Sequence, residues 1–343
     1  MLKIVSIKDS SQWDSIVTTF KEYDVYYLSG YVKAFEIHGD GTPQLLYYDE
    51  NGLRAIYVYM KRATAIRGWF DTITPYGYGG VLFEGDVTET NIKTFWNAYV
   101  NKMQELNIVT NFVRYHPVLA NAEPMRCTTE VVDLGKTIAM DLSSPEVIWE
   151  NITSKNRNMI RKAEKNGVTI FHSSNSALFD DFITMYNATM DKDNATDYYY
   201  FTPNFYKSIQ QDLAGNYELF YAVCNGRIIA MSIILFANKQ MHYHLSGSLF
   251  EYRNLAPTNL LLYKAALWGY EQGFETFHLG GGVGSGEDGL YQFKASFNRK
   301  SNYQFSIAKH IFNQTQYDAL VEERVRLDPT FNKESLFFPL YRS

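Results

Sequence analysis

Basic side chains recur along one predicted helix, residues 154–166. Arg157, Arg161 and Lys165 are four residues apart, so they share one face of a helix. A row of cations of this kind can bind the phosphate groups of a nucleic acid or of a nucleotide. A solvated helix face is the alternative, because cations are also favourable near a helix C-terminus. The spacing predicts Arg157 and Arg161 as substrate-binding residues.

A lysine follows a glycine-rich segment in Phe293-Lys294-Ala295-Ser296-Phe297. On a helix, Phe293 and Phe297 share one apolar face that points towards the core. In a strand, they also share a face. Lys294 therefore points elsewhere, into the cleft that we expect the glycine-rich loop to border. A surface lysine after a turn is the alternative.

Aromatic and histidine side chains stand at two further places. Tyr243 and His244 are neighbours on a predicted central strand, so only one of them can face a site. We predict Tyr243 for that position and treat His244 either as a proton carrier or as a buried histidine with its hydrogen bonds satisfied. Tyr198 begins an aromatic run before a helix, where it can contact a ligand or pack between domains.

Several kinds of chemistry are excluded. The two cysteines and seven histidines form no disulfide framework, zinc spacing or HExxH motif, and we expect no metal site. No pattern of a serine or cysteine nucleophile is visible, so group transfer would be direct. The net charge of −5 means that a polyanion must be held by a local patch.

Composition also bears on location. The chain contains no run approaching the ~18 apolar residues of a membrane span. Its N-terminus lacks the apolar core of a secretory signal. We therefore predict a cytoplasmic protein without an integral membrane segment; its oligomeric state is left open.

The elements that must position these residues form two similar halves. A length of 343 residues favours two domains. Each half contains a hairpin signal, an Asn-Gly turn between β-rich runs, at residues 44–60 and 218–234. Two predicted helices precede each hairpin, and a strand, a helix and another strand follow it. Two unrelated α/β domains that share a hairpin are the alternative to a duplication.

This order is that of the acetyltransferase (GNAT) fold. The sequence thus predicts the α/β class with mixed sheets and two tandem GNAT-like domains. We expect domain 1 at residues 1–140 plus about 313–343, and domain 2 at residues 141–312. A linker is predicted at residues 136–144, and a cleft between the domains.

The loop that would hold acyl-CoA is altered. GNAT enzymes bind pyrophosphate on a (Q/R)-x-x-G-x-(G/A) loop whose N–H groups open a helix. Here Arg253 fits the first position, but Ala256 replaces the glycine. Pro257 removes a donor, and Thr258 adds a branched side chain. The corresponding loop of the first half, residues 74–80, has glycines but no arginine. We predict weak binding of CoA.

Short motifs also follow one another in a fixed order along nearly the whole chain. They are Trp149 with the helix 155–167, Tyr243–Gly247, Pro257–Leu262, Phe277–Gly282, Asp288 and Phe293-Lys294-x-x-Phe297, preceded by Ser29–Lys33 and Tyr76–Gly80. In this ordered set the chain resembles the FemA/FemB/FemX family of peptidoglycan bridge-forming aminoacyltransferases.

The resemblance implies a reaction. Members of that family move an amino acid from aminoacyl-tRNA to the peptide-stem amine of a peptidoglycan precursor, without a cofactor. It implies that Lys33 contacts the diphosphate of the precursor and that Lys294 lies at the reacting centre. Tyr76 and Asp288, which belong to matching motifs, are then expected to bind substrate. It also implies that the C-terminal tail packs on domain 1.

The chain departs from the family in two respects. It has no long charged antiparallel helical pair, so it is similar to the short members. The arginine that assists the diphosphate lysine is not evident, and Lys192 stands near its place.

Two other functions remain as alternatives. One is an N-acyltransferase that uses acyl-CoA to modify a sugar or amino compound. The other is a catalytically silent ligand-binding protein.

Overall fold

The computed structural model describes residues 1–343, which divide into two compact units. Unit 1 comprises Met1–Leu134 and Phe305–Ser343, and unit 2 comprises Gly135–Gln304. Both boundaries between the units lie earlier in the chain than the boundaries predicted from the sequence. Neither unit has a helix of sufficient length and hydrophobicity to cross a bilayer.

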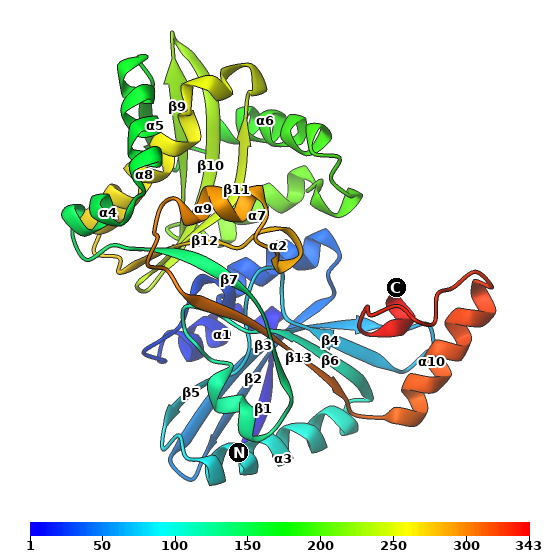
Figure 1. Ribbon diagram of the computed structural model, residues 1–343. Coiled ribbons are helices and arrows are strands. Elements are labelled where there is room, and N and C mark those ends of the chain that lie inside the picture. Colours follow the sequence, from blue (N-terminus) through cyan, green and yellow to red (C-terminus); the bar gives the residue numbers. More distant parts are fainter. The chain divides into compact units, whose positions relative to one another are not determined.

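Unit 1 is a mixed sheet with flanking helices (Figure 1). The strand order is β1-β2-β3-β4-β6-β13, with β5 also paired to β3, and β4 and β6 run parallel. The elements are β1 (Leu2–Ser6), α1 (Ser10–Val17), α2 (Ser29–His38), β2 (Thr42–Glu50), β3 (Leu53–Ala63), β4 (Phe70–Ile73), β5 (Leu82–Gly85), α3 (Glu89–Glu105), β6 (Ile108–Arg114), β13 (Tyr303–Ile311) and α10 (Gln314–Leu327).

Unit 2 has the same kind of sheet. Its strand order is β8-β9-β10-β11-β12-β7, and β11 and β12 run parallel. The elements are β7 (Val131–Asp141), α4 (Pro145–Asn151), α5 (Ser154–Lys165), β8 (Thr169–Ser173), α6 (Leu178–Lys192), α7 (Pro203–Asp212), β9 (Tyr217–Cys224), β10 (Arg227–Ala237), β11 (Gln240–Ser248), α8 (Pro257–Glu271), β12 (Thr276–Gly280) and α9 (Gly289–Ala295).

The two predicted hairpins are confirmed as β2–β3 and β9–β10. Both turn residues have positive φ in each hairpin, 54° and 77° at Asn51 and Gly52, and 51° and 76° at Asn225 and Gly226. A type I′ turn requires this pair of left-handed residues, which Asn-Gly supplies at little cost. Helices α1 and α2 precede the first hairpin and α6 and α7 the second, so each half has the predicted order.

The strand that completes each sheet comes from a part of the chain that is distant in sequence from its neighbour in the sheet. Strand β7 directly follows the first half of the chain, yet it pairs with β12 in unit 2. Strand β13 follows the second half, yet it pairs with β6 in unit 1. The prediction of a linker at 136–144 was therefore wrong for residues 136–141, which belong to β7. The partner that makes this segment a strand lies about 140 residues further along the chain, where no local pattern reports it.

Each unit buries its own apolar core. In unit 1, α3 places Ile92, Phe95, Tyr99 and Met103 against the sheet at helical spacing. In unit 2, the central cluster joins α8 to β10, β11 and β12. Helix α6 lies against β11, where Gly247 permits the close approach, because a Cβ there would lie 2.8 Å from the backbone of Met185.

Candidate functional site

A glycine-rich loop joins β12 to α9 and contacts the side chain of Lys294. Lys294 lies on α9 and is only 9% exposed. Its Nζ donates a hydrogen bond to the carbonyl oxygen of Gly281 at 2.7 Å. An ammonium group has three donors. The other two have no partner in the protein, so they remain available to a substrate oxygen.

Burial changes the acid–base behaviour of this lysine. Desolvation lowers the pKa of Lys294 to about 8, although the negative charge of Asp288 acts in the opposite direction. A lysine in water titrates near 10.4. Lys294 is therefore mostly charged at neutral pH, but its pKa lies only slightly above that pH. Strongly shifted groups of this kind are concentrated at functional sites.

Asp288 holds the loop and the helix in place. Its Oδ1 accepts a hydrogen bond from the N–H of Tyr291 at 2.8 Å, which caps α9, and its Oδ2 accepts one from Val283 at 3.1 Å. These backbone bonds lower the pKa of Asp288. A Cβ at Gly282 would lie 2.5 Å from the same carboxylate, so only glycine fits there. The structure thus gives Asp288 a positioning role, while its predicted substrate contact stays a prediction.

Tyr243 and His244 lie on β11 at a break in the sheet register. Ile233 pairs with Leu245 and Ile234 with Tyr243, so His244 is the extra residue of a β-bulge. The strict alternation expected for the two residues is therefore interrupted. Burial lowers the pKa of His244 to about 3, and His242 adds to the effect. Because a proton carrier needs a pKa near the working pH, His244 does not fit that predicted role.

The side chain of Tyr243 is partly withdrawn from water, and its place in a catalytic site stays a prediction. Its ring packs against the core of unit 2. Burial raises the pKa of its phenol, while hydrogen bonds with Ser246 and Ser232 lower it. The phenol therefore stays neutral and can donate or accept a hydrogen bond.

The parallel strands of unit 2 separate beside the bulge. The ladder between β11 and β12 has three residue pairs and ends at His242 and His278. In unit 1, the corresponding ladder between β4 and β6 continues past the strand ends, because Gly79 donates to Arg114 and forms a bridge with Tyr115. Unit 2 alone therefore has an unpaired stretch of its middle strand beside the following helix.

Arg253 lies in the segment that precedes α8. Its guanidinium lies 3.7 Å from the ring centre of Phe250, and Lys192 lies 5.8 Å from the same ring. Two cations therefore flank one exposed aromatic ring. Ala256 occupies the left-handed position before the helix, with φ of 54°, and no side chain caps α8. The proline at the start of α8 leaves that position without an N–H donor, as the sequence analysis inferred.

The basic helix predicted at 154–166 is α5, but its two arginines differ. Arg157 turns back onto the end of α4, where its Nη1 donates to the carbonyl oxygens of Trp149 and Ile152 at 3.2 and 2.8 Å. Arg161 is exposed, and its guanidinium lies 5.1 Å from the Trp149 ring centre. The guanidinium of Arg157 is thus occupied by carbonyl oxygens of the protein itself, whereas that of Arg161 faces solvent.

Replacement of Arg157 by alanine is expected to destabilise unit 2 by about 1–3 kcal/mol, because it leaves buried carbonyl groups without a charged donor. The same change at Arg161 should cost under about 0.5 kcal/mol, as for an ordinary surface residue. Urea denaturation of both variants measures the difference. Equal stabilities would mean that the contacts of Arg157 contribute nothing.

The remaining predicted residues belong to different units. Tyr198 is 37% exposed and packs edge-on against Tyr199. Lys33 and Tyr76 belong to unit 1, where α2 holds Tyr76 in place. The Tyr31 hydroxyl donates to the Tyr76 carbonyl at 2.7 Å, and Phe35 stacks on the Tyr76 ring.

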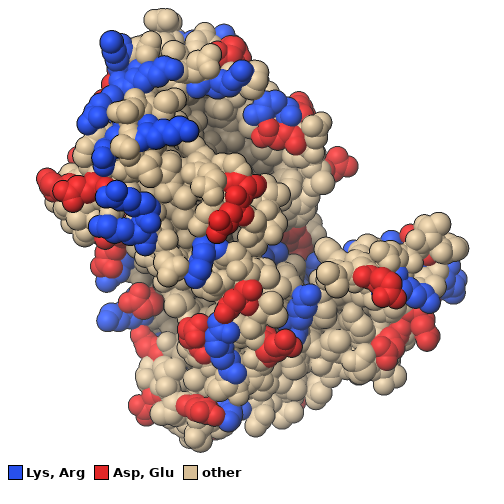
Figure 2. Space-filling view, viewed as in Figure 1, with Lys and Arg blue, Asp and Glu red and all other residues tan.

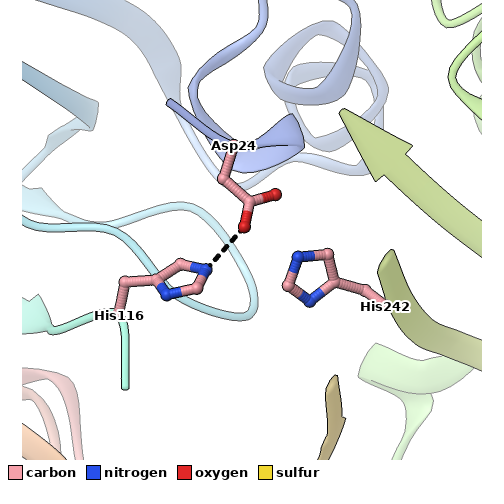
Figure 3. Close-up of side chains that lie close together, drawn as sticks. All are labelled: Asp24, His116 and His242. Atoms are coloured by element: carbon pink, nitrogen blue, oxygen red, sulfur yellow. Dashed lines mark ion pairs between the residues drawn. The ribbon is translucent and has the colours of Figure 1, made fainter. Parts of the chain in front are cut away.

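Unit 1 also contains a buried acid–base pair that the sequence analysis did not single out. Asp24 and His116 are fully buried, with 2.8 Å between Oδ2 and Nε2 (Figure 3). His116 Nδ1 accepts a hydrogen bond from the N–H of Leu119, which places the ring proton on the nitrogen facing Asp24. The pair joins the segment before α2 to the loop after β6.

The structure therefore brings together Lys294, Asp288 and the glycine loop, and separately Arg253 with Lys192. Sequence reasoning missed the Gly281 carbonyl as the partner of Lys294. The run Gly280-Gly281-Gly282 at the end of a strand was the available signal for an exposed main chain at that point.

Comparisons with known proteins agree with this architecture. Residues 153–295 match the family model of the acetyltransferase (GNAT) domain. A search of curated proteins gave no match. Within unit 2, residues 153–295 therefore match a GNAT-type domain, and the chain as a whole has a mixed α/β fold of this type.

Solved structures extend the similarity to nearly the whole chain. FemX aligns with a TM-score of 0.69 at 13% identity, covering 92% of this chain and 99% of that one. A conserved protein of unknown function from Bacteroides thetaiotaomicron gives 0.60 at 11% identity, with coverages of 90% and 98%. The C-terminal domain of a putative lysylphosphatidylglycerol synthetase from Agrobacterium fabrum gives 0.58 at 15%, with 93% and 96%. The resemblance to the FemA/FemB/FemX family is thereby confirmed for the fold.

Proposed function

We propose that this protein transfers an aminoacyl group from aminoacyl-tRNA to an amine of a peptidoglycan precursor. The observation that carries the proposal is Lys294, a buried ammonium with two unused donors, fixed by one carbonyl beside a glycine loop. Its chemistry fits a reaction in which negative charge develops on oxygen. The fold shared with FemX supports the same class of reaction.

The transfer requires little covalent assistance. The neutral amine attacks the ester carbonyl carbon, a C–N bond forms, and the bond to the ribose oxygen breaks. The proton lost by the amine ends on the departing oxygen. Lys294 stabilises the oxygen that carries charge in the transition state, and a fixed donor of this kind acts without reorganisation.

The neighbourhood of α8 favours an ester donor over a thioester of CoA. Ala256 and Pro257 leave few free N–H groups where a pyrophosphate would bind. An aminoacyl ester of RNA does not need that cradle, because its phosphates are distributed along the nucleic acid.

The test is a transfer assay read by mass spectrometry. Purified protein is incubated with aminoacyl-tRNA or acyl-CoA donors and with precursor acceptors that carry a free stem amine. Formation of an amide product from the tRNA donor supports the proposal. Product from acyl-CoA alone, with none from any charged tRNA, overturns it.

Acyl-CoA-dependent N-acylation is the second candidate, because β11, which separates from β12, is followed by α8, at the place of the helix that holds acyl-CoA in GNAT enzymes. We predict that CoA binds with a dissociation constant above about 100 μM. Titration calorimetry measures it. A micromolar or tighter value, about 8 kcal/mol of binding free energy, would favour the second candidate.

A further inference from the structure

Four exposed cations lie on α5 without any carboxylate partner. They are Lys155, Arg161, Lys162 and Lys165. The one acidic residue among them, Glu164, forms an ion pair with Lys264 of α8 at 3.1 Å. Figure 2 shows lysine and arginine side chains gathered over the region of α5, with few acidic ones between them. We call these four residues the α5 cation row.

In two other charged helices of the chain, cations pair with nearby carboxylates. In α3, Lys93 pairs with Glu89. In α10, Arg324 pairs with Asp328, and Arg326 with Glu323. By contrast, Arg161 and Lys165 on α5 are like charges four residues apart, an arrangement that weakens a helix slightly. The excess positive charge is therefore a local property of α5.

The N-terminal end of α5, where the α5 cation row begins, contacts the segment that follows α9, the helix of Lys294. At the start of α5, the N–H of Thr153 donates to the carbonyl of Ser296 at 2.9 Å, and Asn156 Nδ2 donates to its hydroxyl at 2.9 Å. Ser296 directly follows α9, the helix of Lys294. Arg299, which is exposed, donates its N–H to Asn151 beside the same junction.

The dimensions suit a nucleic acid. From Lys155 to Lys165 the helix rises about 15 Å, at about 1.5 Å per residue. That length matches several successive phosphates of an RNA strand. The face lacks what a bilayer surface requires, because no exposed large apolar side chain lies on α4 or α5.

We infer that the α5 cation row binds the phosphate backbone of the RNA portion of the donor, close to its esterified 3′ end. This rests on the proposed function. The row directs the strand along α5 to the junction with α9, so that the ester reaches Lys294. Sequence-independent phosphate contacts suit an enzyme that must accept the common end of an RNA.

The binding test uses a fluorescent RNA hairpin with a single-stranded CCA end, measured by anisotropy. The triple variant Lys155→Glu, Lys162→Glu, Lys165→Glu is compared with Lys8→Glu, Lys207→Glu, Lys333→Glu, which changes the net charge equally with exposed lysines elsewhere. We expect the first to weaken binding at least about 10-fold at low salt and the second less than about 3-fold. The slope of log K against log salt should fall by about 2 for three lost contacts.

A transfer experiment separates this inference from the proposed function. Two donors are compared, a full aminoacyl-tRNA and a minimal aminoacyl ester of adenosine that lacks the RNA body. The α5 variant should lose transfer from the first and retain transfer from the second. Failure of wild type with both donors would overturn the proposed function. Equal use of full tRNA by wild type and the α5 variant overturns the inference alone, as does binding to anionic phospholipid vesicles but not to RNA.

Discussion

Replacement of Lys294 by methionine is expected to lower turnover by at least about 10²-fold, with the fold and substrate affinity nearly unchanged. Loss of one fixed donor to a developing oxyanion commonly costs 10²–10³ in rate. Methionine keeps the length of the aliphatic stem but removes the ammonium that contacts Gly281. Because the interaction is made mainly in the transition state, turnover should fall while the Michaelis constant changes little. Steady-state kinetics of transfer measure both quantities.

Two variants make this result specific. Lys300→Met removes an exposed lysine six residues further on and should leave turnover within about 2-fold. Lys294→Arg keeps the charge and should restore part of the activity. Turnover of Lys294→Met equal to that of wild type, in a protein of normal melting behaviour, removes Lys294 from the mechanism.

The pH dependence tests the charge state that the mechanism needs. Burial lowers the pKa of Lys294 to about 8, so the ammonium is present below that pH and is lost as pH rises through it. The rate at saturating substrate should therefore fall on the alkaline side, with a midpoint near 8. In Lys294→Arg this decline should move to higher pH, because a guanidinium stays charged. An increase in rate through pH 8 would instead make neutral Lys294 a general base.

The repeated fold could be predicted from the sequence because its signals are local. An Asn-Gly turn between β-rich runs specifies a hairpin within about 17 residues of chain, and both hairpins occur as expected. Helix α3 begins and ends where the sequence indicates, since Thr88 caps it and its apolar residues recur at helical spacing.

Features that depend on distant partners could not be predicted in this way. Strand β7 was mistaken for a linker because its neighbour in the sheet, β12, is remote in sequence. Arg157 belongs to a basic repeat, but only the folded chain shows that the end of α4 lies within its reach. The role of His244 was left open between a proton carrier and a buried histidine, because the bulge and the burial that lower its pKa leave no mark in the sequence.

A buried ionic network in unit 1 is a further feature of this non-local kind. Asp71 on β4 is completely buried and pairs with Arg62 of β3, with 2.7 Å between Oδ1 and Nε. Its Oδ2 accepts hydrogen bonds from Arg342 at 2.5 Å and from the hydroxyl of Tyr341 at 3.1 Å. The Tyr341 hydroxyl also lies 2.9 Å from that of Thr110 on β6. The network of Asp71 and Tyr341 thus joins residues 341–342 to three strands of the sheet.

Replacement of Asp71 by asparagine should destabilise this part of unit 1 by about 3 kcal/mol. Removal of one partner from a buried ion pair leaves the other charge uncompensated, and here two guanidinium groups would lose their shared anion. The comparable change Glu123→Gln removes an exposed partner of Arg126 and should cost under about 1 kcal/mol.

Because two units can unfold separately, hydrogen exchange of peptides from β3 and β4 is a better measure than a single melting temperature. Exchange in Asp71→Asn should accelerate about 100-fold in these peptides, whereas β9 and β10 of unit 2 should be unaffected. Unchanged protection of β4 would show that hydrogen bonds of the sheet, and not this carboxylate, hold residues 341–342 in place.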